Sequence, residues 1–146
     1  MSSVYAFPAI MLVDDSRIDN LINKKVLERE LVANHIIVCT SGVEAVDHLR
    51  RIDAGQITDE AEIPALIFVD LYMPEMGGRQ FLDEFSRFSP RVRGKMRIIL
   101  FSGSILSQEQ RTDFENNPSV LRCITKPLQK KNIEELMAVL RENKED

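Results

Sequence analysis

The sequence lacks any long uninterrupted run of apolar residues, which excludes a helix that crosses a membrane. Its N-terminus lacks a basic segment followed by a long apolar stretch, so we expect no secretory signal. Positive charge is in deficit, because 19 Lys and Arg residues oppose 23 Asp and Glu residues and give a net charge of −4. A broad basic surface for binding nucleic acid is therefore not expected.

Cysteine is also scarce, and the two that are present, Cys39 and Cys123, lie within apolar stretches. Their spacing matches no metal-binding motif. We predict two buried, reduced thiols rather than a disulfide. Together with the missing signal and the missing membrane span, this pattern predicts a cytoplasmic protein.

The residues that are present have the composition of a soluble globular protein. Hydrophobic residues make up 44% of the chain and charged residues 29%. A length of 146 residues suits one domain with a core of ordinary size and leaves no room for a second. We therefore expect a single domain over residues 1–146, with a core at about 9–140 and short tails at both ends.

Short apolar segments alternate along the chain with segments of helical periodicity. Strands are expected at residues 9–13, 35–39, 66–69, 96–101 and 120–124, each followed by a helix. The first helix should begin at Arg17 and run for about four turns. Its apolar positions at helical spacing are Ile18, Leu21, Ile22, Val26, Leu27 and Leu31. This alternation predicts an α/β fold around a parallel sheet of five strands with five alternating helices.

Two polar segments interrupt the alternation. Residues 53–64 are acidic and residues 89–95 are basic, and both contain Pro or Gly. We interpret both segments as exposed loops.

Residues 66–78, LIFVDLYMPEMGG, place one carboxylate, Asp70, at the end of a fully apolar run. Such a run is typical of a strand buried on both faces. An unpaired charge there would be costly, so Asp70 must be neutralised, bind a cation or face a wet cleft. The plain alternative is a turn or helix-capping aspartate.

The residues that follow the other expected strands make the functional interpretation stronger. Asp14 and Asp15 follow the first strand, Ser102 the fourth and Lys126 the fifth. Because the carboxyl ends of parallel strands meet at one edge of a sheet, we expect these side chains to converge with Asp70. Taken singly, they could be helix-start acids, a turn hydroxyl and a solvated surface charge. Their shared placement favours a functional site.

Three clustered carboxylates favour a hard divalent cation with oxygen ligands, and we expect Mg²⁺. A carboxylate can also attack a phosphoryl group and form an aspartyl phosphate. That transfer needs positioning and charge neutralisation, which Lys126 and the Ser102 hydroxyl can supply. One aspartate would then accept the phosphoryl group while the others hold the metal.

On these residues the chain resembles the receiver domains of response regulators in two-component signalling. The resemblance covers residues 9–140 and rests on the pair Asp14–Asp15, the segment DLYMPEMGG that starts at Asp70, Ser102, and the dipeptide Lys126–Pro127. It implies a doubly wound, flavodoxin-like sheet with the strand order 2-1-3-4-5.

The resemblance also implies a role for each residue of the site. Asp70 would be the phospho-acceptor, Lys126 would contact the phosphoryl group, and Ser102 would turn its hydroxyl onto it. The implied metal ligands are Asp15 and Asp70 directly, Asp14 through water, and the backbone carbonyl of Tyr72.

Two features depart from the family pattern. The family usually has Tyr or Phe at the position of Cys123, and that ring moves inward when the hydroxyl engages the phosphoryl group. With cysteine there, we expect readout through other side chains or through shifts of loops and helices. Tyr72 and Ser104 occupy the positions that flank the attacking water in relatives, so we expect altered autodephosphorylation.

We therefore expect a phospho-accepting response regulator, and no enzyme activity beyond its own phosphoryl acceptance and loss. The donor would be a sensor histidine kinase or a histidine phosphotransfer protein. Since no further domain follows residue 146, the expected output is a partner protein or onward phosphotransfer.

Two alternatives stay open. One is a small Mg²⁺-dependent phosphohydrolase with an aspartyl nucleophile, although Tyr72 stands where such enzymes commonly carry a second acid. The other is a degenerate receiver that binds partners without phosphorylation, an alternative that Cys123 keeps open.

Overall fold

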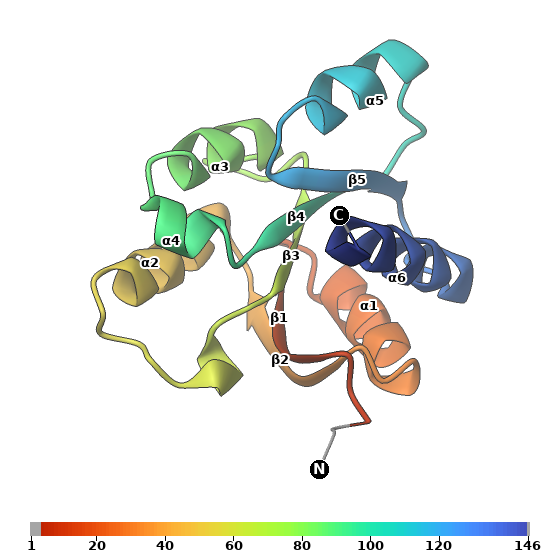
Figure 1. The fold of residues 1–146 in the computed structure, drawn as a ribbon. Helices are drawn as coiled ribbons and strands as arrows, with labels where there is room; N and C mark the ends of the chain where they lie inside the picture. The colour runs from red at the N-terminus through yellow and green to blue at the C-terminus, as the bar shows by residue number, and fades with distance from the viewer. Residues whose placement is uncertain (1–3, 146) are drawn as a thin grey trace.

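The computed structural model describes residues 4–145 and contains one parallel sheet between two layers of helices (Figure 1). The strands are β1 (Phe7–Val13), β2 (Ala33–Cys39), β3 (Leu66–Asp70), β4 (Arg97–Ser102) and β5 (Val120–Thr125). They pair in the order β2-β1-β3-β4-β5, and every pair is parallel. The predicted fold class and strand order are confirmed.

The five predicted helices form between and after these strands. They are α1 (Arg17–Arg29), α2 (Gly42–Asp53), α3 (Gly78–Phe85), α5 (Gln108–Glu115) and α6 (Lys130–Glu145). Side-chain caps fix where several of them begin. Ser41 accepts a hydrogen bond from the backbone N–H of Glu44, and Ser107 forms the predicted capping box with Gln110.

Both polar segments predicted as loops contain a short helical turn. In the basic segment, Ser89 caps the short helix α4 (Pro90–Arg93), and the acidic segment contains the 3₁₀ turn η1 (Glu60–Glu62). The prediction of a plain loop was wrong at residues 90–93. A serine followed by proline is a signal for a helix start, because proline's fixed φ and missing N–H suit the first helical position.

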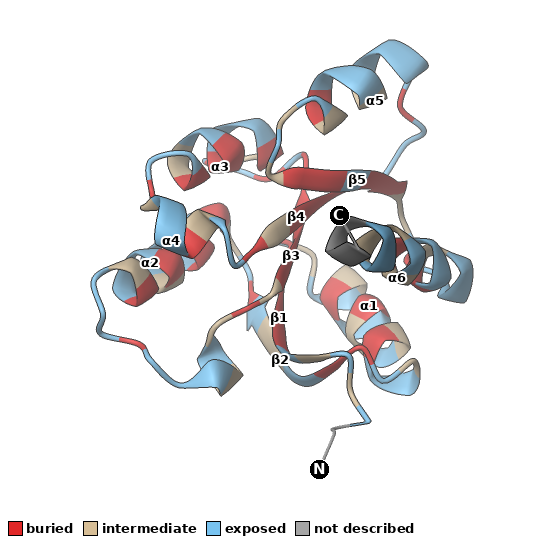
Figure 2. Cartoon of the chain, viewed as in Figure 1, coloured by how far each residue is buried: buried red, intermediate tan, exposed pale blue. Residues whose placement is uncertain are grey.

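The sheet separates two hydrophobic cores, and helices cover both of its faces (Figures 1 and 2). On one face, side chains of α2 and α3 such as Leu49, Phe81 and Phe85 pack with the buried β3 residue Val69. On the other face, Leu27 of α1 and Leu136 of α6 pack with the strand residues of the second core. The strand β3 is buried along its whole length, as its apolar run predicted.

Helix α1 uses only part of the apolar face that its sequence predicts, because Leu27 is buried and Val26 packs against the core while the other predicted positions are exposed. Its buried residues are Asn20, Asn23 and Leu27, whereas Ile18 and Leu21 are 70% and 54% exposed. One polar atom of each asparagine side chain forms a hydrogen bond that offsets part of the cost of burial, although Asn20 Oδ1 has no partner among the described residues. Asn20 donates to the Asp14 carbonyl oxygen at 2.8 Å, and Asn23 accepts from the Leu128 N–H at 3.2 Å. The apolar residues Ile18, Leu21 and Ile22, called here the α1 patch, are left exposed.

Two further expectations concern the core and the membrane. Cys39 and Cys123 are both buried and free, as predicted. Burial raises the pKa of the Cys39 thiol to about 12 and that of the Cys123 thiol to about 11. Among the described residues, no helix is both long enough and apolar enough to cross a membrane.

Candidate functional site

The carboxyl ends of four neighbouring strands bring the predicted site residues to one edge of the sheet. Val13 of β1 pairs with Val69 of β3, so Asp14 and Asp70 follow side by side. Ser102 ends β4 beside Thr125 of β5, and the Ser102 carbonyl oxygen accepts a hydrogen bond from the Lys126 N–H at 2.8 Å. The peptide bond between Lys126 and Pro127 is cis.

Three aspartates form a cluster at this edge. One carboxylate oxygen from each of Asp14, Asp15 and Asp70 lies within 4.8 Å of the others. Asp14 and Asp70 are buried, and Asp15 is exposed. An arrangement of oxygen ligands that is open to solvent on one side fits Mg²⁺, which binds a few carboxylates and retains several waters. The residues present therefore suit the expected metal.

Lys126 supplies the positive charge of the site. Its Nζ lies 2.7 Å from Asp14 Oδ2, 2.9 Å from Asp19 Oδ2 and 3.4 Å from Asp70 Oδ2. Its side chain is largely buried, so the pairs with the buried Asp14 and Asp70 are only weakly screened by solvent, whereas the pair with the partly exposed Asp19 is screened more. The ammonium group is thus held between the predicted metal ligands Asp14 and Asp70.

The site shifts the pKa values of its two central groups upward. Burial and the charge of Asp14 raise the pKa of the Asp70 carboxyl, and the pairing with Lys126 offsets only part of this rise. For Lys126, burial alone would lower the pKa, but the hydrogen bonds to Asp14 and Asp19 outweigh burial and raise it. A further positive charge near Asp70 would stabilise its ionised form.

The sequence did not identify Asp19 as part of the site. Asp19 lies in the first turn of α1, three residues after Ser16, whose hydroxyl accepts a hydrogen bond from the Asp19 N–H at 3.2 Å. An acid at this spacing from a serine is a signal for a helix start. That signal does not reveal the pairing with Lys126, since the two residues meet only in the folded chain.

The structure does not place the Ser102 hydroxyl against Asp70. Ser102 Oγ instead donates to the carbonyl oxygen of Ser104 at 2.5 Å and accepts from the Ser104 N–H at 3.2 Å. The side chain is buried at the end of β4, so the hydroxyl is held within its own loop. A turn of the Ser102 side chain toward Asp70 would break both of these hydrogen bonds.

Tyr72 lies next to the site with its side chain directed largely to solvent. The residue is 67% exposed, and its N–H donates to Asp70 Oδ1 at 3.4 Å. The backbone of Tyr72 is therefore adjacent to Asp70, the expected phospho-acceptor. A role for its carbonyl oxygen in metal binding stays a prediction.

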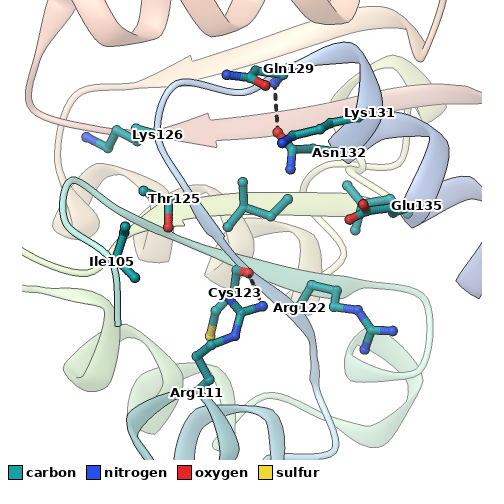
Figure 3. Close-up of a pocket in the computed structure, with 12 residues that line it drawn as sticks. Ile105, Arg111, Arg122, Cys123, Thr125, Lys126, Gln129, Lys131, Asn132 and Glu135 are labelled. Atoms are coloured by element: carbon teal, nitrogen blue, oxygen red, sulfur yellow. Dashed lines mark hydrogen bonds between the residues drawn. The ribbon is translucent and has the colours of Figure 1, made fainter. Parts of the chain in front are cut away.

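Cys123 lies on β5, three residues before Lys126, and its backbone is held by α5. Glu115 Oε2 accepts from the Cys123 N–H at 2.9 Å, and Arg111 Nη2 donates to the Cys123 carbonyl oxygen at 3.1 Å. Figure 3 shows Arg111 reaching Cys123 while Lys126 points away from this pair. The neighbouring cavity has a volume of about 420 Å³ and is bordered by Cys123, Lys126 and Ile105.

Comparison with known proteins points to one family. The family model described as "Response regulator receiver domain" matches residues 10–138. No curated protein matches the sequence significantly.

Solved structures of receiver proteins share the fold. A two-component response regulator from Cytophaga hutchinsonii matches with a TM-score of 0.79 and 25% identity, covering 92% of this chain and 98% of that chain. A response regulator receiver protein from Dyadobacter fermentans matches with a TM-score of 0.72 and 26% identity, covering 88% and 94%. The receiver domain of an Arabidopsis thaliana histidine kinase, complexed with Mg²⁺ and BeF₃⁻, matches with a TM-score of 0.65 and 24% identity, covering 95% and 91%.

Proposed function

Because the chain belongs to the response regulator receiver domain family of two-component signalling, we propose that Asp70 accepts a phosphoryl group from a phosphohistidine. The donor would be a sensor histidine kinase or a histidine phosphotransfer protein in the cytoplasm. The observation that carries the proposal is the joint position of Asp70, the acids Asp14 and Asp15, and Lys126 at one edge of the sheet. A turn aspartate would not require this combination.

The transfer is a displacement at phosphorus. A carboxylate oxygen of Asp70 forms a bond to phosphorus, the bond from phosphorus to the histidine nitrogen breaks, and the imidazole leaves with the electron pair and takes up a proton. Lys126 Nζ, 3.4 Å from Asp70 Oδ2, is close enough to pair with an oxygen of the incoming group. The phosphoryl group is later lost by hydrolysis, in which water attacks phosphorus and releases inorganic phosphate and the Asp70 carboxylate.

The metal expected here is Mg²⁺, and Asp15, Asp70 and the Tyr72 carbonyl would hold it directly, with Asp14 acting through water. When bound, it neutralises charge that builds up on the phosphoryl oxygens. The Arabidopsis receiver domain complexed with Mg²⁺ and BeF₃⁻, which has a similar fold, supports this assignment.

Phosphorylation would change the surface near β4, α5, β5 and α6. The Ser102 hydroxyl must leave Ser104 to reach a phosphoryl group on Asp70, which frees the loop before α5. Because Arg111 and Glu115 of α5 hold the backbone of Cys123, a shift of α5 is transmitted to β5 without an aromatic side chain. This surface would exist in two conformations, and phosphorylation would shift the equilibrium toward the one that a partner protein binds.

The α1 patch is the surface best placed for the donor. Asp19 lies in the same turns of α1 as Ile18 and Ile22 and pairs with Lys126, so the patch begins at the edge of the site. A histidine donor must bring its helices over Asp70, and exposed apolar residues there provide area to bury.

The test is incubation with Mg²⁺ and acetyl phosphate or phosphoramidate, followed by intact mass measurement of the wild type and of Asp70→Asn. The proposal predicts one added phosphoryl group that needs Mg²⁺ and is absent in the variant. Continued turnover of small phosphate esters would instead indicate a phosphohydrolase. An unchanged mass in the wild type would contradict the proposal and favour a receiver that works without phosphorylation.

A further inference from the structure

A second cavity lies at the opposite end of the sheet from Asp70, with a volume of about 760 Å³. Its walls come from residues at the start of β1, β3 and β4 and from one side of α6, the helix that packs on one face of the sheet (Figure 1). The apolar part of its lining consists mainly of Phe7, Leu66, Ile133, Met137 and Leu140. The volume and the apolar walls are typical of a site for a small molecule.

The charged residues around this cavity are mostly cations. Lys95, Arg97 and Arg141 line it together with a single acid, Glu134. None of these three cations forms an ion pair with a described residue. Within the described part of the chain, the buried Nε of Arg97 also has no hydrogen-bond acceptor. Arg97 therefore brings to the cavity wall a positive charge that has no partner among the described residues, and an anionic ligand would supply one.

We propose that this cavity binds a small amphipathic carboxylate. The carboxylate head would accept hydrogen bonds from the Arg97 guanidinium, whose planar fork matches the two carboxylate oxygens. The aliphatic tail would lie against Met137, Leu140 and Phe7. An apolar molecule without a charge would leave Arg97 unpaired, and a small anion without a tail would leave the walls exposed. The inference does not depend on phosphorylation of Asp70.

The test uses sodium octanoate as the probe, below its micelle concentration, with backbone amide shifts followed by NMR on the ¹⁵N-labelled protein. The proposal predicts saturable shifts that centre on the first residues of β3 and β4 and on α6. Acetate, which lacks the tail, and 1-octanol, which lacks the charge, should each bind more weakly by about tenfold or more. If octanoate gives no saturable shifts there, or if 1-octanol binds as tightly, the proposal is wrong.

Matched variants distinguish a specific binding site from nonspecific adsorption of octanoate. Arg97→Met keeps an apolar stem but removes the guanidinium, and should weaken octanoate binding by about tenfold. Arg51→Met, on the exposed surface of α2, should bind octanoate like the wild type. Arg141→Met removes another cation from the wall of the same cavity and should also weaken octanoate binding, so it replaces Arg97→Met if that variant fails to fold. Equal binding by the wild type and by a folded Arg97 or Arg141 variant would overturn the proposal.

Discussion

At the scale of single residues, ionising the Asp70 carboxyl costs the folded protein stability. Burial and the neighbouring Asp14 raise the pKa of its carboxyl, which means that the folded protein holds this proton to higher pH than the unfolded chain does. Stability is therefore lost as pH rises from the ordinary carboxyl pKa, about 3.9, through the raised folded value. The clustered carboxylates that suit a metal ion therefore destabilise the folded protein when no metal is bound.

We expect Asp70→Asn to raise the free energy of unfolding of the metal-free protein by about 1 kcal/mol at neutral pH, because it removes a buried charge without changing shape. The gain should vanish below about pH 4, where the wild-type carboxyl is protonated in both states. Urea unfolding curves at several pH values measure this. Asp47→Asn, at an exposed position of α2, is the control and should change little. A less stable Asp70→Asn protein at neutral pH would contradict the account.

Tyr72 belongs to the same scale, because its backbone N–H donates to Asp70 and its side chain is largely exposed next to this contact. We expect the ring to shield an acyl phosphate on Asp70 from water. We expect Tyr72→Asn to shorten the lifetime of the phosphorylated protein by about threefold or more. The decay of the phosphorylated mass after removal of the donor measures the lifetime. Tyr72→Phe keeps the ring and should decay like the wild type. Equal lifetimes for all three proteins would show that the ring provides no shield.

At the scale of elements, helix α1 shows what hydrophobic periodicity cannot resolve. The pattern predicted that Ile18, Leu21 and Ile22 face the core, but Asn20 and Asn23 do so instead. Their burial depends on partners in the loops after β1 and β5, which sequence spacing does not reveal. By contrast, the capping box of α5 was predicted correctly, because both of its partners are local in sequence.

The exposed α1 patch leads to a prediction for phosphotransfer. With the phosphorylated histidine phosphotransfer domain that reacts fastest with the wild type, we expect Leu21→Asn to lower the transfer rate by about tenfold, because it removes apolar contact area. Labelling by acetyl phosphate should stay unchanged, since that donor needs no docking surface. Leu31→Asn is the matched control, because Leu31 is exposed beyond the far end of α1 and has a positive φ that asparagine tolerates. Equal rates for Leu21→Asn and the wild type would exclude the patch as the docking surface.

Strand β5 is the element whose free edge is protected by side chains. Among the described residues it pairs only with β4, and Glu115 accepts from the Cys123 N–H on its other side. We expect Glu115→Ala to lower the free energy of unfolding by about 1 kcal/mol, because a backbone donor loses a charged acceptor. Urea unfolding measures the change, and Glu135→Ala, at an exposed position of α6, is the control. If both variants unfold at the same urea concentration, the Glu115 contact does not stabilise the edge.

At the scale of the whole molecule, the sequence predicted the fold and most of the site for one reason. Buried strands of a parallel sheet read as apolar runs, and the residue after each run lies at a shared edge, so Asp14, Asp70 and Lys126 could be placed together without coordinates. The Ser102 hydroxyl bonded to Ser104 and the pairing of Asp19 with Lys126 could not be foreseen. Both depend on side-chain orientations that are decided only when the loops pack.

The central claim is that a phosphoryl group is carried on the carboxylate of Asp70, and chemical trapping of the acyl phosphate tests it most directly. Borohydride reduces an aspartyl phosphate to homoserine, and peptide sequencing by mass spectrometry then locates the reduced residue after labelling with Mg²⁺ and acetyl phosphate. The account predicts homoserine at position 70 and at neither Asp14 nor Asp15. Homoserine at one of those two positions, or a phosphate on Ser102 that resists reduction, would contradict it.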